Sequence, residues 1–218
     1  MRIDFVSDVA CPWCAVGLNA LELALQRIGP GLAVDLHVQP FELKPQMAPE
    51  GEDAAEHLKA KYGLNDAQLA HNRGVLRERG AAVGFNFGDR PRIWNTFDAH
   101  RLLHWAGLQG RQRELKHALL QAYHGEARNP GAADVLLELA ARVGLDTAQA
   151  AEILRNGAYA AEVREAEQFW QRAGIHSVPA VVINRRHLIQ GGQPPEVFEQ
   201  ALRQIAQEAQ EAQEPDGA

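Results

Sequence analysis

The pattern of apolar and polar positions separates two strand-containing ends from a helical middle. Residues 2–7 form a short apolar run typical of a strand, and residues 12–28 repeat apolar positions at helical spacing. Residues 33–39 alternate apolar with polar side chains, as a second strand does. A strand, a helix and a strand in succession predict a βαβ unit with a right-handed crossover. The three prolines within 40–49 should then take the chain out of the sheet.

From about Gly51 to Gly174 the pattern is almost wholly helical, with no convincing repeat. Asn95 and Asp146 stand where N-caps are expected, and Gly63, Gly144 and Gly174 stand where helices should stop. The predicted helices span 53–62, 66–80, 95–107, 111–125, 131–143, 147–155 and 158–173.

Strand character returns near the C-terminus. Residues 180–184 and 187–190 predict a hairpin, and a proline after Gly191-Gly192 opens a last helix, whose polar end beyond Gln207 we expect to fray. The order βαβ, helical block, ββα predicts an α/β protein with a thioredoxin fold that carries a large inserted all-helical domain. The predicted divisions are 1–45 and 175–210 for the thioredoxin-fold parts, 46–174 for the helical insertion and 211–218 for a flexible tail.

Composition restricts the class of protein without changing this outline. The 218 residues suit one large domain or a domain with an insertion, and 46% hydrophobic content supplies a core. A net charge of −6 with no basic tract argues against nucleic-acid binding. Residues 1–10 contain two aspartates and do not resemble a signal peptide, and the apolar runs are too short to span a membrane. We therefore expect a cytoplasmic protein without a membrane partner.

The only two cysteines lie three residues apart, in Cys11-Pro12-Trp13-Cys14, between the first strand and the first helix. The free N–H groups and the dipole at a helix N-terminus favour a thiolate at Cys11. Cys14 lies about one helical turn further on, where it can attack a mixed disulfide formed at Cys11. The motif predicts a catalytic dithiol–disulfide switch, because no third cysteine is present to form a separate structural disulfide.

Several segments together resemble the FrnE-like branch of the DsbA family of thioredoxin-fold oxidoreductases. They follow one another in the family's order over nearly the whole chain. They are Asp8 to Cys14, Pro40 to Leu43, Asn95 to Arg101, Val178 to Ala180 and Gly191 to Pro195.

The resemblance implies roles for six residues. Cys11 would be the nucleophile and Cys14 the resolving thiol of a protein-disulfide oxidoreductase. The Val178–Pro179 bond would be cis and would face the cysteines, with Pro12, Trp13, Val178 and Pro179 contacting substrate. Protein or small-molecule thiols and disulfides would be the partners. No metal and no cofactor are implied, and glutathione is a candidate redox partner.

The same superfamily contains kappa-class glutathione transferases and 2-hydroxychromene-2-carboxylate isomerases. Those enzymes commonly have serine at the position of Cys11, and acidic or hydroxyl side chains after the last strand that hold glutathione. Here the corresponding segment is Gly191-Gly192-Gln193-Pro194. Both departures favour dithiol exchange, with a glutathione-dependent transferase or isomerase as the alternative.

Other interpretations of these residues remain open at this point. The two cysteines with His100 and His104 are a candidate tetrahedral zinc site of a binding module, although histidines on a helix are by default surface or interface residues. Free cysteines can also be inert core residues. Asp8 is either a proton acceptor or a cap. Three arginines, at positions 90, 92 and 101, either hold an anionic substrate or pair with surface carboxylates.

Overall fold

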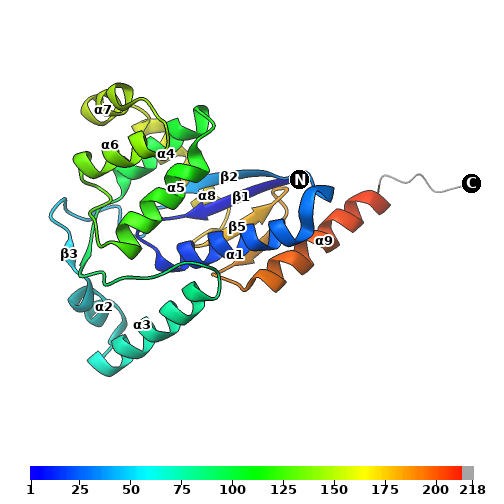
Figure 1. The fold of residues 1–218 in the computed structure, drawn as a ribbon, viewed down its shortest axis with the longest axis horizontal. Helices are drawn as coiled ribbons and strands as arrows, with labels where there is room; N and C mark the ends of the chain where they lie inside the picture. The colour runs from blue at the N-terminus through cyan, green and yellow to red at the C-terminus, as the bar shows by residue number, and fades with distance from the viewer. Residues whose placement is uncertain (213–218) are drawn as a thin grey trace, which may run out of the picture.

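The computed structural model describes residues 1–212, and a four-stranded sheet lies at its centre (Figure 1). The strands are ordered β2-β1-β5-β6. Their bounds are Arg2–Ser7 for β1, Asp35–Pro40 for β2, Ala180–Ile183 for β5 and His187–Gln190 for β6. β1 pairs in parallel with β2 and antiparallel with β5, so segments far apart in the sequence meet in one sheet. The predicted βαβ…ββα order is confirmed.

Helices cover both faces of this sheet. α1 (Pro12–Ile28) and α9 (Pro195–Glu211) lie side by side on one face, over Ile3 and Phe5 of β1 (Figure 1). On the other face, Val6 packs with Trp170 of α8 (Ala160–Arg172). β1 is therefore buried on both sides: its apolar residues Ile3, Phe5 and Val6 are fully buried on the two faces.

The middle of the chain is helical, and its later helices form a bundle against the sheet (Figure 1). Its bounds are α2 Ala54–Tyr62, α3 Asp66–Ala81, α4 Phe97–Leu108, α5 Gln112–Leu120, a π-helical turn Gln121–Gly125, α6 Ala133–Arg142 and α7 Thr147–Asn156. α4 to α7 share an apolar core that includes Leu102, Trp105 and Leu139. Val9 and Ala10 belong to the same core. The bundle therefore packs directly on the loop that precedes Cys11.

Most predicted bounds agree with the structure within two residues, and three details differ. The middle segment also contains a two-stranded ladder, β3 (Glu52–Asp53) with β4 (Arg92–Ile93), which is too short to leave a periodic pattern. A 3-10 turn, Gly29–Gly31, follows α1. The N-cap of α4 is Thr96 rather than Asn95, whose side chain instead accepts the Phe97 N–H at 2.9 Å.

The last helix continues beyond Gln207, where the sequence predicted fraying, to Glu211. Side-chain hydrogen bonds from Gln204 to Glu208 and from Gln207 to Glu211 support this extension at i,i+4 spacing. The rest of the predicted tail, residues 213–218, lies outside the described residues, and the domain divisions stay predictions. Within residues 1–212, no helix combines the length and apolarity that crossing a membrane requires.

Candidate active site

Cys11 is the N-cap residue of α1, at the point where the chain leaves β1 and its following loop. Pro12 occupies the first turn, where its missing N–H costs no hydrogen bond. The pKa of the Cys11 thiol is lowered, chiefly by a hydrogen bond with the Cys14 side chain and further by the N–H groups of Cys14 and Trp13. Burial and the negative charge of Asp8 oppose this effect without cancelling it. Cys11 is thus the more acidic thiol of the pair.

Cys14 has the opposite character. Its side chain is fully buried, whereas Cys11 retains 4% exposure. Burial, followed by the interaction with Cys11, raises the pKa of Cys14 well above its ordinary value. Both thiols are free in the structure. The slightly exposed Cys11 favours the thiolate while the fully buried Cys14 holds its proton, which is the asymmetry that a nucleophile and a resolving thiol need.

The loop before β5 faces this pair. The Val178–Pro179 peptide bond is cis, and the Cys11 thiol donates to the Val178 carbonyl oxygen at 3.5 Å. Close approach is possible because α1 has glycine at position 17, where a Cβ atom would lie 3.1 Å from Pro179 Cγ. Trp13 is 36% exposed beside the cysteines. The structure therefore brings together the sequence-predicted site residues, which are Cys11, Pro12, Trp13, Cys14, Val178 and Pro179.

Asp8 anchors the loop between β1 and α1. Its fully buried carboxylate accepts hydrogen bonds from Leu43 N–H at 2.7 Å and from the Thr96 hydroxyl at 2.7 Å. It also accepts from Ala10 N–H at 3.1 Å and from His100 Nε2 at 3.3 Å. Burial alone would raise the pKa of Asp8, but the hydrogen bond and charge of His100 and the other donors lower it overall. The hydrogen bonds that Asp8 accepts favour the role of a cap over that of a proton acceptor. As a cap, its carboxylate anchors the loop that precedes Cys11.

The histidines do not assemble the zinc site that the sequence allowed. His100 is buried against Asp8 rather than on the helix surface, and His104 stacks on Tyr159 with ring centroids 5.1 Å apart. Across residues 1–212, no three His, Cys, Asp or Glu side chains form a group that could hold a metal ion.

Arg90 and Arg79 flank the cysteines, and of the two only Arg90 was a candidate from the sequence. Arg90 donates to the Ala10 carbonyl at 2.9 Å, and Arg79 donates to the Gly192 carbonyl at 2.8 Å while lying 5.9 Å from the Trp13 ring centroid.

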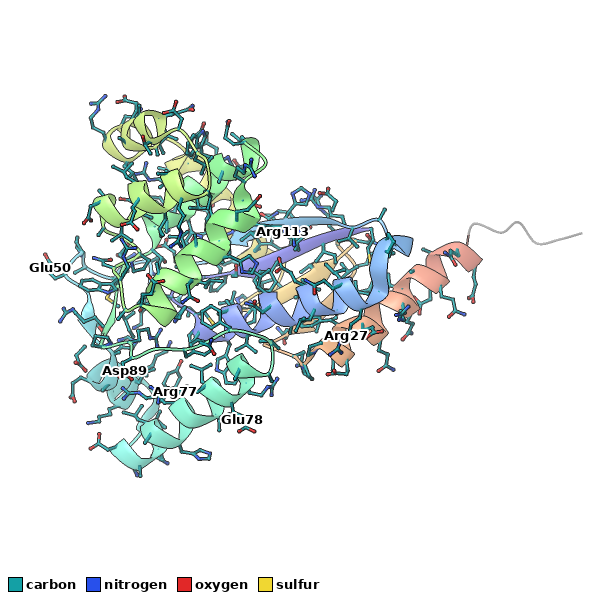
Figure 2. The ribbon with its side chains drawn as sticks, viewed as in Figure 1. Arg27, Glu50, Arg77, Glu78, Asp89 and Arg113 are labelled. Carbon is teal, nitrogen blue, oxygen red and sulfur yellow. The ribbon has the colours of Figure 1, made fainter. Side chains whose placement is uncertain are left out.

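An ion pair between Arg77 and Asp89, at 2.7 Å, ties α3 to the segment that carries Arg90 (Figure 2). Arg101 is instead committed to the Ile153 and Ala158 carbonyls inside the bundle. Arg101 is therefore excluded as a substrate contact near Cys11.

His124, in the π-helical turn, contacts the loop between β1 and α1 from the side of the helical bundle. Its Nε2–H donates to the Val9 carbonyl at 2.8 Å, and the ring is buried. Burial, followed by the charge of Arg90, lowers the pKa of His124 from 6.5 to about 3. His124 is therefore neutral, with the proton on Nε2.

We predict that His124→Leu weakens the loss of stability in acid. The unfolded chain protonates His124 below pH 6.5, whereas the folded protein resists protonation down to about pH 3. The wild type therefore loses stability as pH falls through this window, by up to about 1.4 kcal/mol per pH unit from this group. Urea unfolding at pH 7, 6, 5 and 4 should show that the free energy of unfolding falls less steeply with decreasing pH in the variant than in the wild type. Identical slopes would contradict the burial of a neutral His124.

A family model described as the DSBA-like thioredoxin domain matches residues 2–203. The chain belongs to this family. It is 28% identical over 204 residues to the Bacillus subtilis (strain 168) protein described as "Uncharacterized protein YwbO", covering 93% of this chain and 96% of that one. The family resemblance in the sequence is thereby confirmed.

Solved structures agree with this membership. The probable DsbA oxidoreductase SCO1869 from Streptomyces coelicolor is 35% identical, with a TM-score of 0.88 covering 100% of this chain and 93% of that one. A 2-hydroxychromene-2-carboxylate isomerase superposes with a TM-score of 0.76 at 14% identity, covering 98% of this chain and 100% of that one. At that identity the isomerase shows a shared fold alone. The DsbA-like thioredoxin fold of the chain is therefore shown from both sequence and structure.

Proposed function

We propose that this DsbA-like protein is a thiol–disulfide oxidoreductase that works through Cys11 and Cys14. The proposal rests on the opposite properties of the two thiols. Cys11 has a lowered pKa at the start of α1 and contacts the Val178 carbonyl, while the buried Cys14 behind it has a raised pKa. Its family and the 35%-identical probable DsbA oxidoreductase support the same reaction class.

In the reductase direction, the Cys11 thiolate attacks a substrate disulfide and releases one substrate thiol. Cys14 then attacks the Cys11 sulfur of the mixed disulfide, so that the Cys11–Cys14 bond forms and the second substrate thiol leaves. The oxidase direction is the reverse of these two steps. A low Cys11 pKa stabilises the reduced form above that pKa, and the advantage is lost as pH falls through it.

Substrate would lie across Trp13 and the Val178–Pro179 segment. An extended chain would pair by strand addition with the backbone of the part-buried Val178, whereas the 36% exposed Trp13 offers an aromatic surface. Protein or small-molecule disulfides both satisfy this chemistry. We further propose that no resident cofactor is needed, that glutathione serves as a redox partner, and that the reaction takes place in the cytoplasm.

Turnover of a mixed disulfide between glutathione and a cysteine peptide tests the proposal. We expect the wild type to release the peptide thiol catalytically. In this assay glutathione returns the enzyme to its reduced form, and glutathione reductase reduces the oxidised glutathione that results. Glutathione binding in a thermal-shift series without any such turnover would overturn the proposal and favour the glutathione-dependent transferase or isomerase.

We also predict that Gly17→Ala impairs exchange more than it affects folding. The new Cβ would lie 3.1 Å from Pro179 Cγ and would push α1 from the segment that faces Cys11. We expect kcat/KM to fall about tenfold, a loss of about 1.4 kcal/mol in transition-state stabilisation. Gly74→Ala in α3 is the control, because nothing lies within 4 Å of its Cβ.

The control should keep full turnover and gain about 1 kcal/mol of stability from helix propensity. Equal turnover in both variants would show that the approach of α1 to Pro179 has no role.

A further inference from the structure

Lys116 of α5 is a fully buried lysine. Among the described residues, its Nζ atom finds no hydrogen-bond partner. Burying an ammonium group without a partner is costly, so such a residue needs compensation from elsewhere. The oxidoreductase steps described above make no use of this group.

The position of Lys116 is fixed by its neighbours on the same helical face. One turn before it, Gln112 accepts the Val38 N–H of β2 at 2.9 Å. Two turns after it, His124 donates to the Val9 carbonyl at 2.8 Å. The face therefore runs from the edge of the sheet to the loop before the cysteines, and Lys116 lies between these two anchors.

The helical face that carries Lys116 packs towards the redox site. Leu120, one turn further along the same face, packs in the apolar core that contains Cys11 and Cys14. The charge of Lys116 interacts with Cys14, Asp8 and Cys11, the three groups that stabilise its protonated form. In return, Lys116 favours the thiolate of Cys14.

Two competing effects set the charge of Lys116. Burial lowers its pKa below the ordinary value, and the negative charges near it oppose that change. His124, the other titratable group close to it, is neutral and adds no charge. A buried ammonium group with a lowered pKa is well suited to respond to a change of charge on a nearby sulfur.

We propose that Lys116 is a positioning residue of the redox pair, whose ammonium group stabilises negative charge on the Cys14 sulfur. This inference rests on the proposed function. During resolution the Cys14 sulfur gains thiolate character, attacks Cys11 and forms the internal disulfide. The Cys11–substrate S–S bond breaks, and the Cys14 proton ends on the departing substrate thiol. In the reverse direction Lys116 stabilises Cys14 as the leaving thiolate.

Lys116→Met tests the proposal because it removes the charge and keeps most of the volume. We expect release of the mixed disulfide to slow about tenfold, since a nearby opposite charge shifts a pKa by about one unit or more. The charge of Lys116 also interacts with Cys11, the thiolate of the reduced pair. Its loss should therefore shift the equilibrium constant with glutathione about tenfold towards the disulfide, which makes the potential about 30 mV more negative. Stability should stay equal or rise, because an unpaired buried charge is replaced by an apolar side chain.

Arg113→Met is the matched control. It removes a cation from the same helix, but from an exposed position where Arg113 pairs with Glu22 at 2.8 Å (Figure 2). We expect it to leave release rate and potential unchanged. A Lys116→Met protein with wild-type rate and potential would overturn the inference and leave the proposed function intact. Absence of any redox transition in the wild type would overturn both.

The wild type supplies a test that needs no variant to fold. Lys116 is one of four lysines, and the other three are not buried, so its 13C-labelled side chain should titrate apart from theirs. We expect the pKa of Lys116 to be higher in the reduced protein, where thiolate charge is present, than in the disulfide form. Equal pKa values in the two forms would refute the interaction.

Discussion

Replacing Cys11 with serine will abolish thiol–disulfide exchange, whereas replacing Cys14 with serine will arrest exchange at the mixed disulfide. Cys11 is the thiol with the lowered pKa and the only one of the two with any exposure. Without it, no substrate sulfur can be attacked, and we expect turnover to fall at least about 10³-fold. Without Cys14, Cys11 still reacts, but nothing inside the protein displaces the substrate.

Mass spectrometry after incubation with oxidised glutathione separates these outcomes. The Cys14→Ser protein should carry one glutathione adduct at Cys11, and the Cys11→Ser protein should carry none, because the remaining thiol is fully buried with a raised pKa. The double variant has no thiol, so it should carry no adduct and sets the background. Adducts on Cys14 alone, or full turnover by either single variant, would reverse or remove the assigned roles.

Replacing Asp8 with alanine will cause the largest loss of stability of any single change near the site. The carboxylate satisfies four donors, including two backbone N–H groups, and its removal leaves them buried and unpaired. We expect a loss of about 3–5 kcal/mol in the free energy of unfolding at pH 7. Asp8→Asn is the matched variant, since it keeps the size and one acceptor oxygen, and it should lose less.

Acid should reproduce part of this loss in the wild type. The folded pKa of Asp8 is lowered, so its stabilisation is fully present above the unfolded pKa of about 3.9 and is lost as pH falls through the folded value. Denaturant titrations that continue below pH 4 should show this drop in the wild type and a smaller one in Asp8→Asn. A variant as stable as the wild type at pH 7 would contradict the anchoring role.

Asp8 also has a chemical signature. Its charge raises the pKa of Cys11, so the Asp8→Asn variant should have a lower Cys11 pKa than the wild type. Thiolate absorbance as a function of pH measures this value, and it separates the electrostatic effect of Asp8 from its effect on folding.

Local pattern was enough to predict the elements that carry the site. The apolar run of β1, the helical periodicity of α1 and the hairpin β5–β6 are properties of short stretches of sequence. The placement of Cys11 at a helix N-terminus followed from its position between the first two, and the structure bears this out. β3 and β4, with two residues each, are too short for any such pattern.

The contacts that support the site could not be predicted from the sequence, because they are long-range. Asp8 binds residues 35 and 92 positions away, at Leu43 and His100, and nothing near it in the sequence indicates those partners. Lys116 occupies one position on an amphipathic helix, where a lysine is ordinarily expected to reach solvent. Only the packing of α5 against the loop before Cys11 shows that it does not.

A redox titration of the Cys11–Cys14 pair against glutathione buffers decides whether the two cysteines form a dithiol–disulfide switch. Trp13 fluorescence or thiol alkylation gives the fraction oxidised at each ratio, and the Cys14→Ser protein controls for adduct formation. We expect one two-electron transition with a definable midpoint and a single internal disulfide at its oxidised end. Two thiols that stay free at every ratio would contradict it and leave the CxxC motif a structural feature of α1.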